Sequence, residues 1–166
     1  MVIGCSGAGK STLARRLART LAIPHVELDG LYWRSGWIER PMSELRDAIA
    51  RWVEEPAWVM DGNYIMTFDL RAPAADTIVW LDLARWACMY GVLSRIGRGY
   101  GRTREGLPAG CPERLDLEFL KYVWNFNARQ RPRIVAALEQ FPGHAQLHRL
   151  ESRKDGERFI AMVERR

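Results

Sequence analysis

Apolar residues in this chain occur in two patterns that alternate along its length. Short apolar runs, typical of buried strands, lie at residues 1–3, 58–60 and 76–81, and two further strand candidates of mixed polarity lie at residues 25–28 and 146–150. Apolar residues spaced three or four apart, typical of one helix face, cover residues 11–22, 42–55, 85–96, 115–126 and 156–163. Because strands and helices alternate, the pattern predicts a single domain of the α/β class, in three αβα layers, with a five-stranded parallel sheet between helices.

Three details of the pattern lead to specific expectations. Residues 31–41 alternate between aromatic and polar side chains, which favours a loop. The helix predicted at residues 85–96 aligns Trp86, Tyr90 and Leu93 on one face, so we expect that face to be the apolar one. Near the end of the chain, Pro132 either starts a new helix or kinks the preceding one.

The stretch GCSGAGKS at residues 4–11 matches the phosphate-binding pattern G-x-x-x-x-G-K-[ST]. An apolar run precedes it and a helical pattern follows, which is the context that a P-loop needs. In such a loop, backbone N–H groups and the positive end of the helix attract phosphate oxygens. We predict that Lys10 reaches the β- and γ-phosphates of ATP and that the Ser11 hydroxyl is a Mg²⁺ ligand. The predicted nucleotide-binding residues are Gly4, Ser6, Gly7, Ala8, Gly9, Lys10, Ser11 and Thr12.

Three aspartates follow predicted strands: Asp29 in VELDG, Asp61 in WVMDG and Asp82 in VWLD. Ligands of an open α/β sheet bind beyond the carboxyl ends of its strands. One carboxylate there could hold a Mg²⁺-bound water, and a second could orient the attacking group or accept its proton. The alternative is that each aspartate only caps a turn, as Asp-Gly pairs often do. The hypothesis assigns catalytic roles to Asp29 and Asp61 and keeps Asp82 as a third candidate.

Residues 97–114 (GRGYGRTREGLPAGCPER) form a glycine-rich segment with little apolar content, which is typical of a mobile loop. Arginines lie on both sides of it: Arg95, Arg98, Arg102 and Arg104 at its start, and Arg129, Arg131 and Arg133 beyond it. This arrangement predicts a lid whose guanidinium groups close on a transferring phosphoryl group. The catalytic candidates are Arg95, Arg98, Arg102 and Arg131. A solvated basic face and a nucleic-acid patch are the alternatives.

An aromatic set near the two aspartates could line a pocket for a second substrate. Its members are Tyr32, Trp33 and Trp37, with Asn63 and Tyr64 after Asp61. Burial in the core is the alternative for these side chains. The histidines, His25, His144 and His148, lack the spacing of a metal site, so we expect them to be structural.

Composition and charge narrow the class of protein. Of the 25 basic residues only three are lysines, and the net charge is +5, which fits either a polyanionic small ligand or nucleic acid. The chain has no apolar run near the length of a membrane span and no signal-peptide pattern. Its three cysteines, Cys5, Cys88 and Cys111, are far apart and odd in number, so we expect reduced thiols in a cytoplasmic protein without membrane partners.

The chain resembles the bacterial adenylate-kinase-like P-loop proteins labelled DNA topology modulation proteins. The resemblance rests on GCSGAGKSTLARRLA (4–18), HVELDGLYW (25–33), WVMDGNY (58–64), DTIVWLD (76–82) and GCPERLDLEFLKYVWNF (110–126). It implies a five-stranded adenylate-kinase-like core with a lid and with ATP and Mg²⁺ as ligands. In adenylate kinases proper an arginine-bearing domain between the second and third strands holds AMP. Here that region is short and aromatic and offers Arg34 and Arg40, which does not favour AMP as acceptor.

Two functional hypotheses follow. The first is an ATP-dependent kinase that transfers the γ-phosphoryl group to a small acceptor, either a nucleotide-like compound or another metabolite. The second is a nucleotide-dependent regulator that contacts DNA and influences its topology. The positive charge and the family label support the second hypothesis, but the sequence shows no helix-turn-helix or similar reading element.

Overall fold

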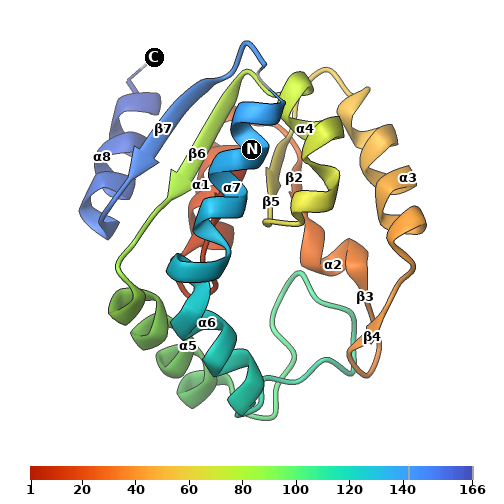
Figure 1. Ribbon diagram of the computed structural model, residues 1–166, viewed down its shortest axis with the longest axis vertical. Coiled ribbons are helices and arrows are strands. Elements are labelled where there is room, and N and C mark those ends of the chain that lie inside the picture. Colours follow the sequence, from red (N-terminus) through yellow and green to blue (C-terminus); the bar gives the residue numbers. More distant parts are fainter. Residues whose placement is uncertain (142, 166) are drawn as a thin grey trace.

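The computed structural model describes residues 1–141 and 143–165 and has a five-stranded sheet at its centre (Figure 1). The strands lie in the order β2-β5-β1-β6-β7, and every pairing is parallel. Their bounds are Val2–Gly4 for β1, His25–Glu27 for β2, Val59–Asp61 for β5, Thr77–Leu81 for β6 and Gln146–Leu150 for β7. The α/β class and the five-stranded parallel sheet predicted from the sequence are confirmed.

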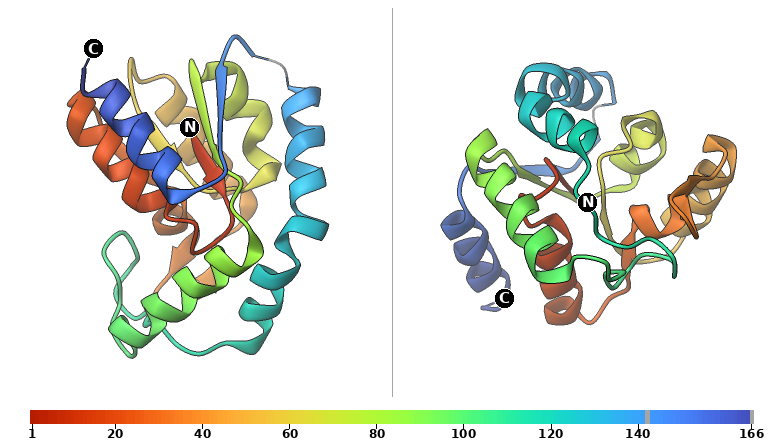
Figure 2. Two further views of the ribbon diagram at one scale, coloured as in Figure 1. Left: turned by 90° about the vertical axis from the view of Figure 1, so that its left-hand side faces the viewer. Right: turned by 90° about the horizontal axis from the view of Figure 1, so that it is seen from below.

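Helices cover both faces of this sheet (Figure 2). Helices α1 and α8 pack together on one face, and α4 and α7 lie on the other. Helix α3 packs beside α4, and α5 packs against α6 below the sheet in Figure 1. The helices run over Lys10–Leu21 (α1), Leu28–Tyr32 (α2), Met42–Val53 (α3), Phe68–Ala74 (α4), Arg85–Gly99 (α5), Leu117–Arg129 (α6), Arg131–Gln140 (α7) and Arg153–Val163 (α8).

Two apolar clusters hold these layers together. The larger surrounds β1 and β6 and includes Ile3, Val79 and Phe68, which are at most 2% exposed. The smaller lies under α3, where Leu45 and Ile49 pack with Met60 of β5. Strand β1 lies between β5 and β6, so both of these strands hold the residues at which the P-loop begins.

Helix α5 turns a different face to the core than the sequence pattern predicted. The residues expected to face inward are 45% to 68% exposed: Trp86, Tyr90 and Leu93. The buried residues of α5 are instead Cys88, Val92 and Ile96. The close approach of α5 to the P-loop explains the rotation, because a Cβ on Gly91 would collide with the carbonyl oxygen of Gly7. Only the face that carries Gly91 can pack there.

Several short elements were not predicted. The segment 31–41, expected as a loop, contains the end of α2 and a two-stranded antiparallel hairpin of β3 (Trp33–Arg34) and β4 (Ile38–Glu39). A 3-10 turn, η1 (Ile65–Thr67), and helix α4 follow β5.

The ambiguity at Pro132 is resolved in favour of a new helix. Helix α6 ends at Arg129, and α7 begins at Arg131 with Pro132 in its first turn, where a missing N–H costs nothing. Among the helices of the described residues, none combines the length and the apolar character that crossing a membrane requires.

Candidate functional site

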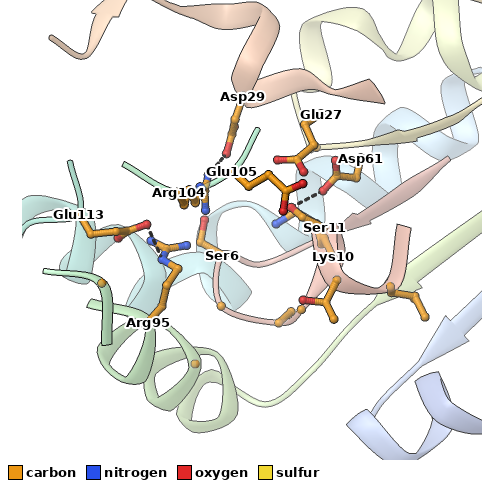
Figure 3. A pocket seen from close by; sticks show the side chains of 18 of the residues that line it. Ser6, Lys10, Ser11, Glu27, Asp29, Asp61, Arg95, Arg104, Glu105 and Glu113 are labelled. Carbon is orange, nitrogen blue, oxygen red and sulfur yellow. Dashed lines mark hydrogen bonds and ion pairs between the residues drawn. The ribbon is translucent and has the colours of Figure 1, made fainter. Parts of the chain in front are cut away.

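A cavity of about 1330 Å³ lies beyond the carboxyl ends of β1, β2 and β5 (Figure 3). Its wall includes the P-loop, the first turns of α1, the carboxylates at two strand ends, the aromatic hairpin and the glycine-rich segment between α5 and α6. Sites for a single drug-sized ligand measure roughly 300–1,000 Å³. The cavity therefore has room for two ligands.

The P-loop forms one end of this cavity. Seven of the eight predicted nucleotide-binding residues line it: Ser6, Gly7, Ala8, Gly9, Lys10, Ser11 and Thr12. The eighth, Gly4, lies behind the loop with φ +140°, and a Cβ there would collide with Leu81. Helix α1 begins at Lys10, so the N–H groups of its first turn lie at the cavity. The Lys10 ammonium donates to the carbonyl oxygen of Cys5 at 3.2 Å.

Asp61, at the end of β5, is buried beside the loop. Its Oδ2 accepts a hydrogen bond from the Ser11 hydroxyl at 2.6 Å, and its Oδ1 lies 3.2 Å from Nε2 of His25. Asn63 anchors the same turn, because its side chain bonds both the N–H and the carbonyl oxygen of Gly4, at 2.9 and 2.8 Å. The structure thus brings the predicted Mg²⁺ ligand and a strand-end carboxylate together.

Asp29 also lines the cavity, but not from the turn that its Asp-Gly sequence suggested. It belongs to the first turn of α2, which continues β2 directly. Its Oδ1 accepts a hydrogen bond from the Tyr64 hydroxyl at 2.8 Å, and its Oδ2 accepts one from Arg104 at 2.7 Å. Burial, reinforced by the Asp29 charge, raises the pKa of Tyr64 above its ordinary value, so this phenol is a proton donor at neutral pH.

Four of the predicted lid arginines line the cavity: Arg95, Arg98, Arg102 and Arg104. Arg95 forms an ion pair with Glu113 at 2.9 Å, next to the Arg104–Asp29 pair (Figure 3). Burial lowers the pKa of Arg95, and the neighbouring charge of Arg104 adds to this effect. Both cations are therefore held inside the cavity wall by carboxylates.

The glycine-rich segment 97–114 lies across the cavity from α5 to the hairpin (Figures 1 and 2). Its far end is bonded to the hairpin, where the Gly36 N–H donates to the Gly110 carbonyl at 3.0 Å and the Trp37 indole donates to the Pro112 carbonyl at 3.2 Å. The segment is therefore held at both ends, by α5 and by the hairpin.

Three other predicted arginines do not line the cavity: Arg129, Arg131 and Arg133. Arg131 instead pairs with Asp82 at 3.0 Å and lies over the Trp80 ring, on the side of the sheet covered by α7. Asp82 also accepts from Arg149 at 2.7 Å. This corrects the placement of Arg131 among the lid cations, and it places Asp82 in a structural ion-pair cluster.

Comparison with solved structures shows what this architecture resembles. A candidate kinase from Chloroflexus aurantiacus matches with a TM-score of 0.58 and 16% identity, covering 99% of this chain and 96% of that one. Shikimate kinase from Bacteroides thetaiotaomicron matches with a TM-score of 0.58 and 17% identity, covering 99% of this chain and 94% of that one. The chain has the α/β fold of P-loop kinases. At this identity the likeness concerns the fold alone.

Searches by sequence add no family. No protein-family model matches the chain, and no curated protein matches it. Neither structural neighbour carries the label of DNA topology modulation that the sequence resemblance suggested. That label is therefore unsupported, whereas the kinase fold is confirmed.

Sequence reasoning missed several residues of the cavity. Glu27, at the end of β2, pairs with Arg15 of α1 at 2.5 Å, and both line the wall. Glu27 could have been found, because it ends the same predicted strand as Asp29. His25, expected to be structural, does not line the cavity, but its Nε2 lies 3.2 Å from Oδ1 of Asp61. Nothing in the sequence pointed to Arg15, because the spacing of several arginines along a helix does not show which of them faces a ligand.

Cys5 lies inside the P-loop with its thiol buried. A hydrogen bond with Cys88 and burial raise the pKa of the Cys5 thiol, so the reactive thiolate is disfavoured. These facts indicate that Cys5 is a small packing residue of the loop.

Proposed function

We propose that this protein is a kinase that transfers the γ-phosphoryl group of ATP to a hydroxyl group of a small acceptor. The observation that carries the proposal is one continuous cavity whose wall contains both the P-loop and Asp29. Its volume of about 1330 Å³ suits a nucleotide and a second compound together. The P-loop kinase fold is consistent with this chemistry but does not by itself specify it.

The donor end suits a nucleotide triphosphate with Mg²⁺. The Ser11 hydroxyl and the Asp61 carboxylate, 2.6 Å apart, offer the oxygen donors that Mg²⁺ prefers, one directly and one through water. Bound there, Mg²⁺ would neutralise charge on the β- and γ-phosphates. Lys10 has no carboxylate partner among the described residues, so its ammonium can leave the Cys5 carbonyl for phosphate oxygens.

Two lid arginines are available for the transferring phosphoryl group. Arg98 bonds only to Ser94 of its own helix, and Arg102 forms no ion pair within the described part of the chain. Planar guanidinium groups suit the charge that spreads over the equatorial oxygens in the transition state. Arg98 and Arg102 would therefore stabilise transfer, while the paired Arg95 fixes the base of the lid.

Asp29 would accept the proton of the acceptor hydroxyl. Its Oδ1 is held by the neutral Tyr64 phenol, which leaves Oδ2 for the reacting group once Arg104 moves toward the phosphates. The acceptor oxygen then forms its bond to the γ-phosphorus as the bond to the β-phosphate oxygen breaks. The hydroxyl proton passes to Asp29, and ADP leaves.

Release of ADP in a coupled assay, with Mg·ATP alone and with a panel of nucleosides, nucleotides and other hydroxyl compounds, tests this proposal. We expect one acceptor class to accelerate ADP release strongly. Lys10→Ala should abolish ATP binding, whereas Asp29→Asn should retain it and lower acceptor-dependent turnover by about 10²–10⁴-fold. Lys121→Ala, on the exposed side of α6, is the matched control. Tight ATP binding without acceptor-dependent turnover, or full activity of Asp29→Asn, would contradict the proposal.

A further inference from the structure

The end of the cavity away from the P-loop includes residues from the stretch 29–39, and Tyr64. Two kinds of side chain from these residues dominate the wall there, carboxylates and aromatic rings: Asp29, Glu39, Tyr32, Trp33, Trp37 and Tyr64. Within the described chain, no lysine or arginine of this stretch lines the cavity. The acceptor end therefore lacks a cation of its own.

The arginines nearest to this end in sequence are directed away from it. Arg34, on β3, pairs with Glu44 of α3 at 2.9 Å, and Arg40 pairs with the same carboxylate at 3.6 Å. Neither arginine lines the cavity. An anion bound among the aromatic residues would receive no charge compensation from them.

Two cations from other parts of the chain pair with carboxylates of the cavity wall, whereas Arg98 and Arg102, which form no ion pair among the described residues, are assigned above to the transferring phosphoryl group. Arg15 of α1 bonds Glu27, and Arg104 of the lid bonds Asp29. Glu39 of β4, in contrast, forms no ion pair with any described residue. When Arg104 moves from Asp29 toward the phosphates, the carboxylates of Asp29 and Glu39 have no cationic partner among the described residues.

The aromatic residues form a continuous row beside these carboxylates. Ring centroids lie 5.1 Å apart for Tyr64 and Tyr32, 5.1 Å for Tyr32 and Trp33, and 5.4 Å for Trp33 and Trp37, each pair edge to face. All four rings line the cavity. Such a row packs well against a planar or apolar group, and its faces attract cations and repel anions.

We infer that the acceptor is a hydroxyl compound without phosphate or carboxylate groups, neutral or cationic, with a planar or apolar face that packs on this aromatic row. The inference rests on the proposed function and specifies its second substrate. It excludes nucleoside monophosphates and favours compounds of the size and charge of nucleosides or aromatic amino alcohols. An anionic group placed near Asp29 and Glu39 would face like charges in a partly enclosed site, which should weaken binding at least about tenfold.

Three indole probes that differ only in their side chain test the inference: tryptophol (neutral hydroxyl), tryptamine (cation) and indole-3-acetate (anion). Their binding is measured by saturation-transfer NMR and titration, with and without a non-hydrolysable ATP analogue and Mg²⁺. We expect tryptophol and tryptamine to bind at least tenfold more tightly than indole-3-acetate. Trp33→Ala should abolish the binding of these probes, because Trp33 belongs to the aromatic row on which they are expected to pack.

The matched variants are Glu39→Gln and Glu55→Gln, since Glu55 is an exposed carboxylate outside the cavity. Glu39→Gln should weaken the binding of tryptamine relative to that of tryptophol, whereas Glu55→Gln should change the binding of neither compound. Equal or tighter binding of indole-3-acetate, or no binding of any probe, would overturn the inference. Failure of the ATP analogue to bind would instead refute the proposed function, because the ranking of the three probes is read independently of it.

Discussion

Arg71, on α4, is the largest fully buried side chain of the protein's described part, and it holds the turn that carries the site. Its guanidinium donates to the carbonyl oxygens of Gly62 and Asn63 at 3.1 and 2.5 Å, and to the Thr67 hydroxyl at 2.9 Å. This turn connects Asp61 to the Asn63 side chain that anchors the P-loop. We predict that Arg71→Met destabilises the fold and loosens the nucleotide site together.

The magnitude follows from the bonds that would be lost. Three buried acceptors lose a charged donor, at about 1–3 kcal/mol each. Burial lowers the pKa of Arg71 to about 9, which shows that its charge is itself costly, so removing the charge offsets part of the loss. The net decrease in the free energy of unfolding should be about 2–4 kcal/mol. For a chain of this size that corresponds to a decrease in Tm of about 10 °C.

Urea and thermal unfolding followed by circular dichroism measure this change, and titration with a fluorescent ATP analogue measures the effect on the site. Arg51→Met, at an exposed position of α3, is the matched control and should stay within about 0.5 kcal/mol of the unaltered protein. A loss below 1 kcal/mol for Arg71→Met, or a stable variant with unchanged nucleotide affinity, would refute this reasoning.

Three further predictions concern the same end of the sheet. Gly7→Ala should reduce stability by about 1–3 kcal/mol and abolish ATP binding in a titration, because Gly7 has φ +80° and a Cβ would collide with the backbone of α5. Asn63→Leu removes both bonds to Gly4 and should reduce stability by about 2 kcal/mol in urea unfolding, with weaker ATP binding. Burial first, and the charge of Asp29 second, raise the pKa of Tyr64 above the ordinary value of 10.0. The unfolded chain ionises this tyrosine at lower pH than the folded one, so the free energy of unfolding should fall above about pH 10, and less steeply for Tyr64→Phe.

The sequence predicted the sheet because strand and helix patterns alternate, and because three of the strands contain a short apolar run followed by a polar residue or glycine. It predicted the P-loop because that motif depends on local backbone geometry. It failed where tertiary contacts decide: the buried face of α5 follows from the contact between Gly91 and Gly7, which no periodicity shows. The pairing of Arg131 with Asp82 was equally invisible, since charge alone does not say which of many arginines faces a phosphate.

The aromatic hairpin illustrates a different limit. Residues 31–41 mix aromatic, charged and turn-forming residues, so their sequence favours a loop. The hairpin is stabilised by contacts from outside it, namely the backbone bond from Gly36 to Gly110 and the bond from Trp37 to Pro112 of the lid. These partners lie more than seventy residues away along the chain, beyond the reach of any local pattern.

The same contacts connect the two ends of the cavity energetically. A lid that opens must break its bonds to the hairpin and the ion pair between Arg104 and Asp29. A compound that packs on the hairpin aromatics and replaces Arg104 at Asp29 would free that arginine for the phosphates while the lid remains on the hairpin. Acceptor binding and the positioning of lid cations would then favour each other, which limits phosphoryl transfer to water when no acceptor is present.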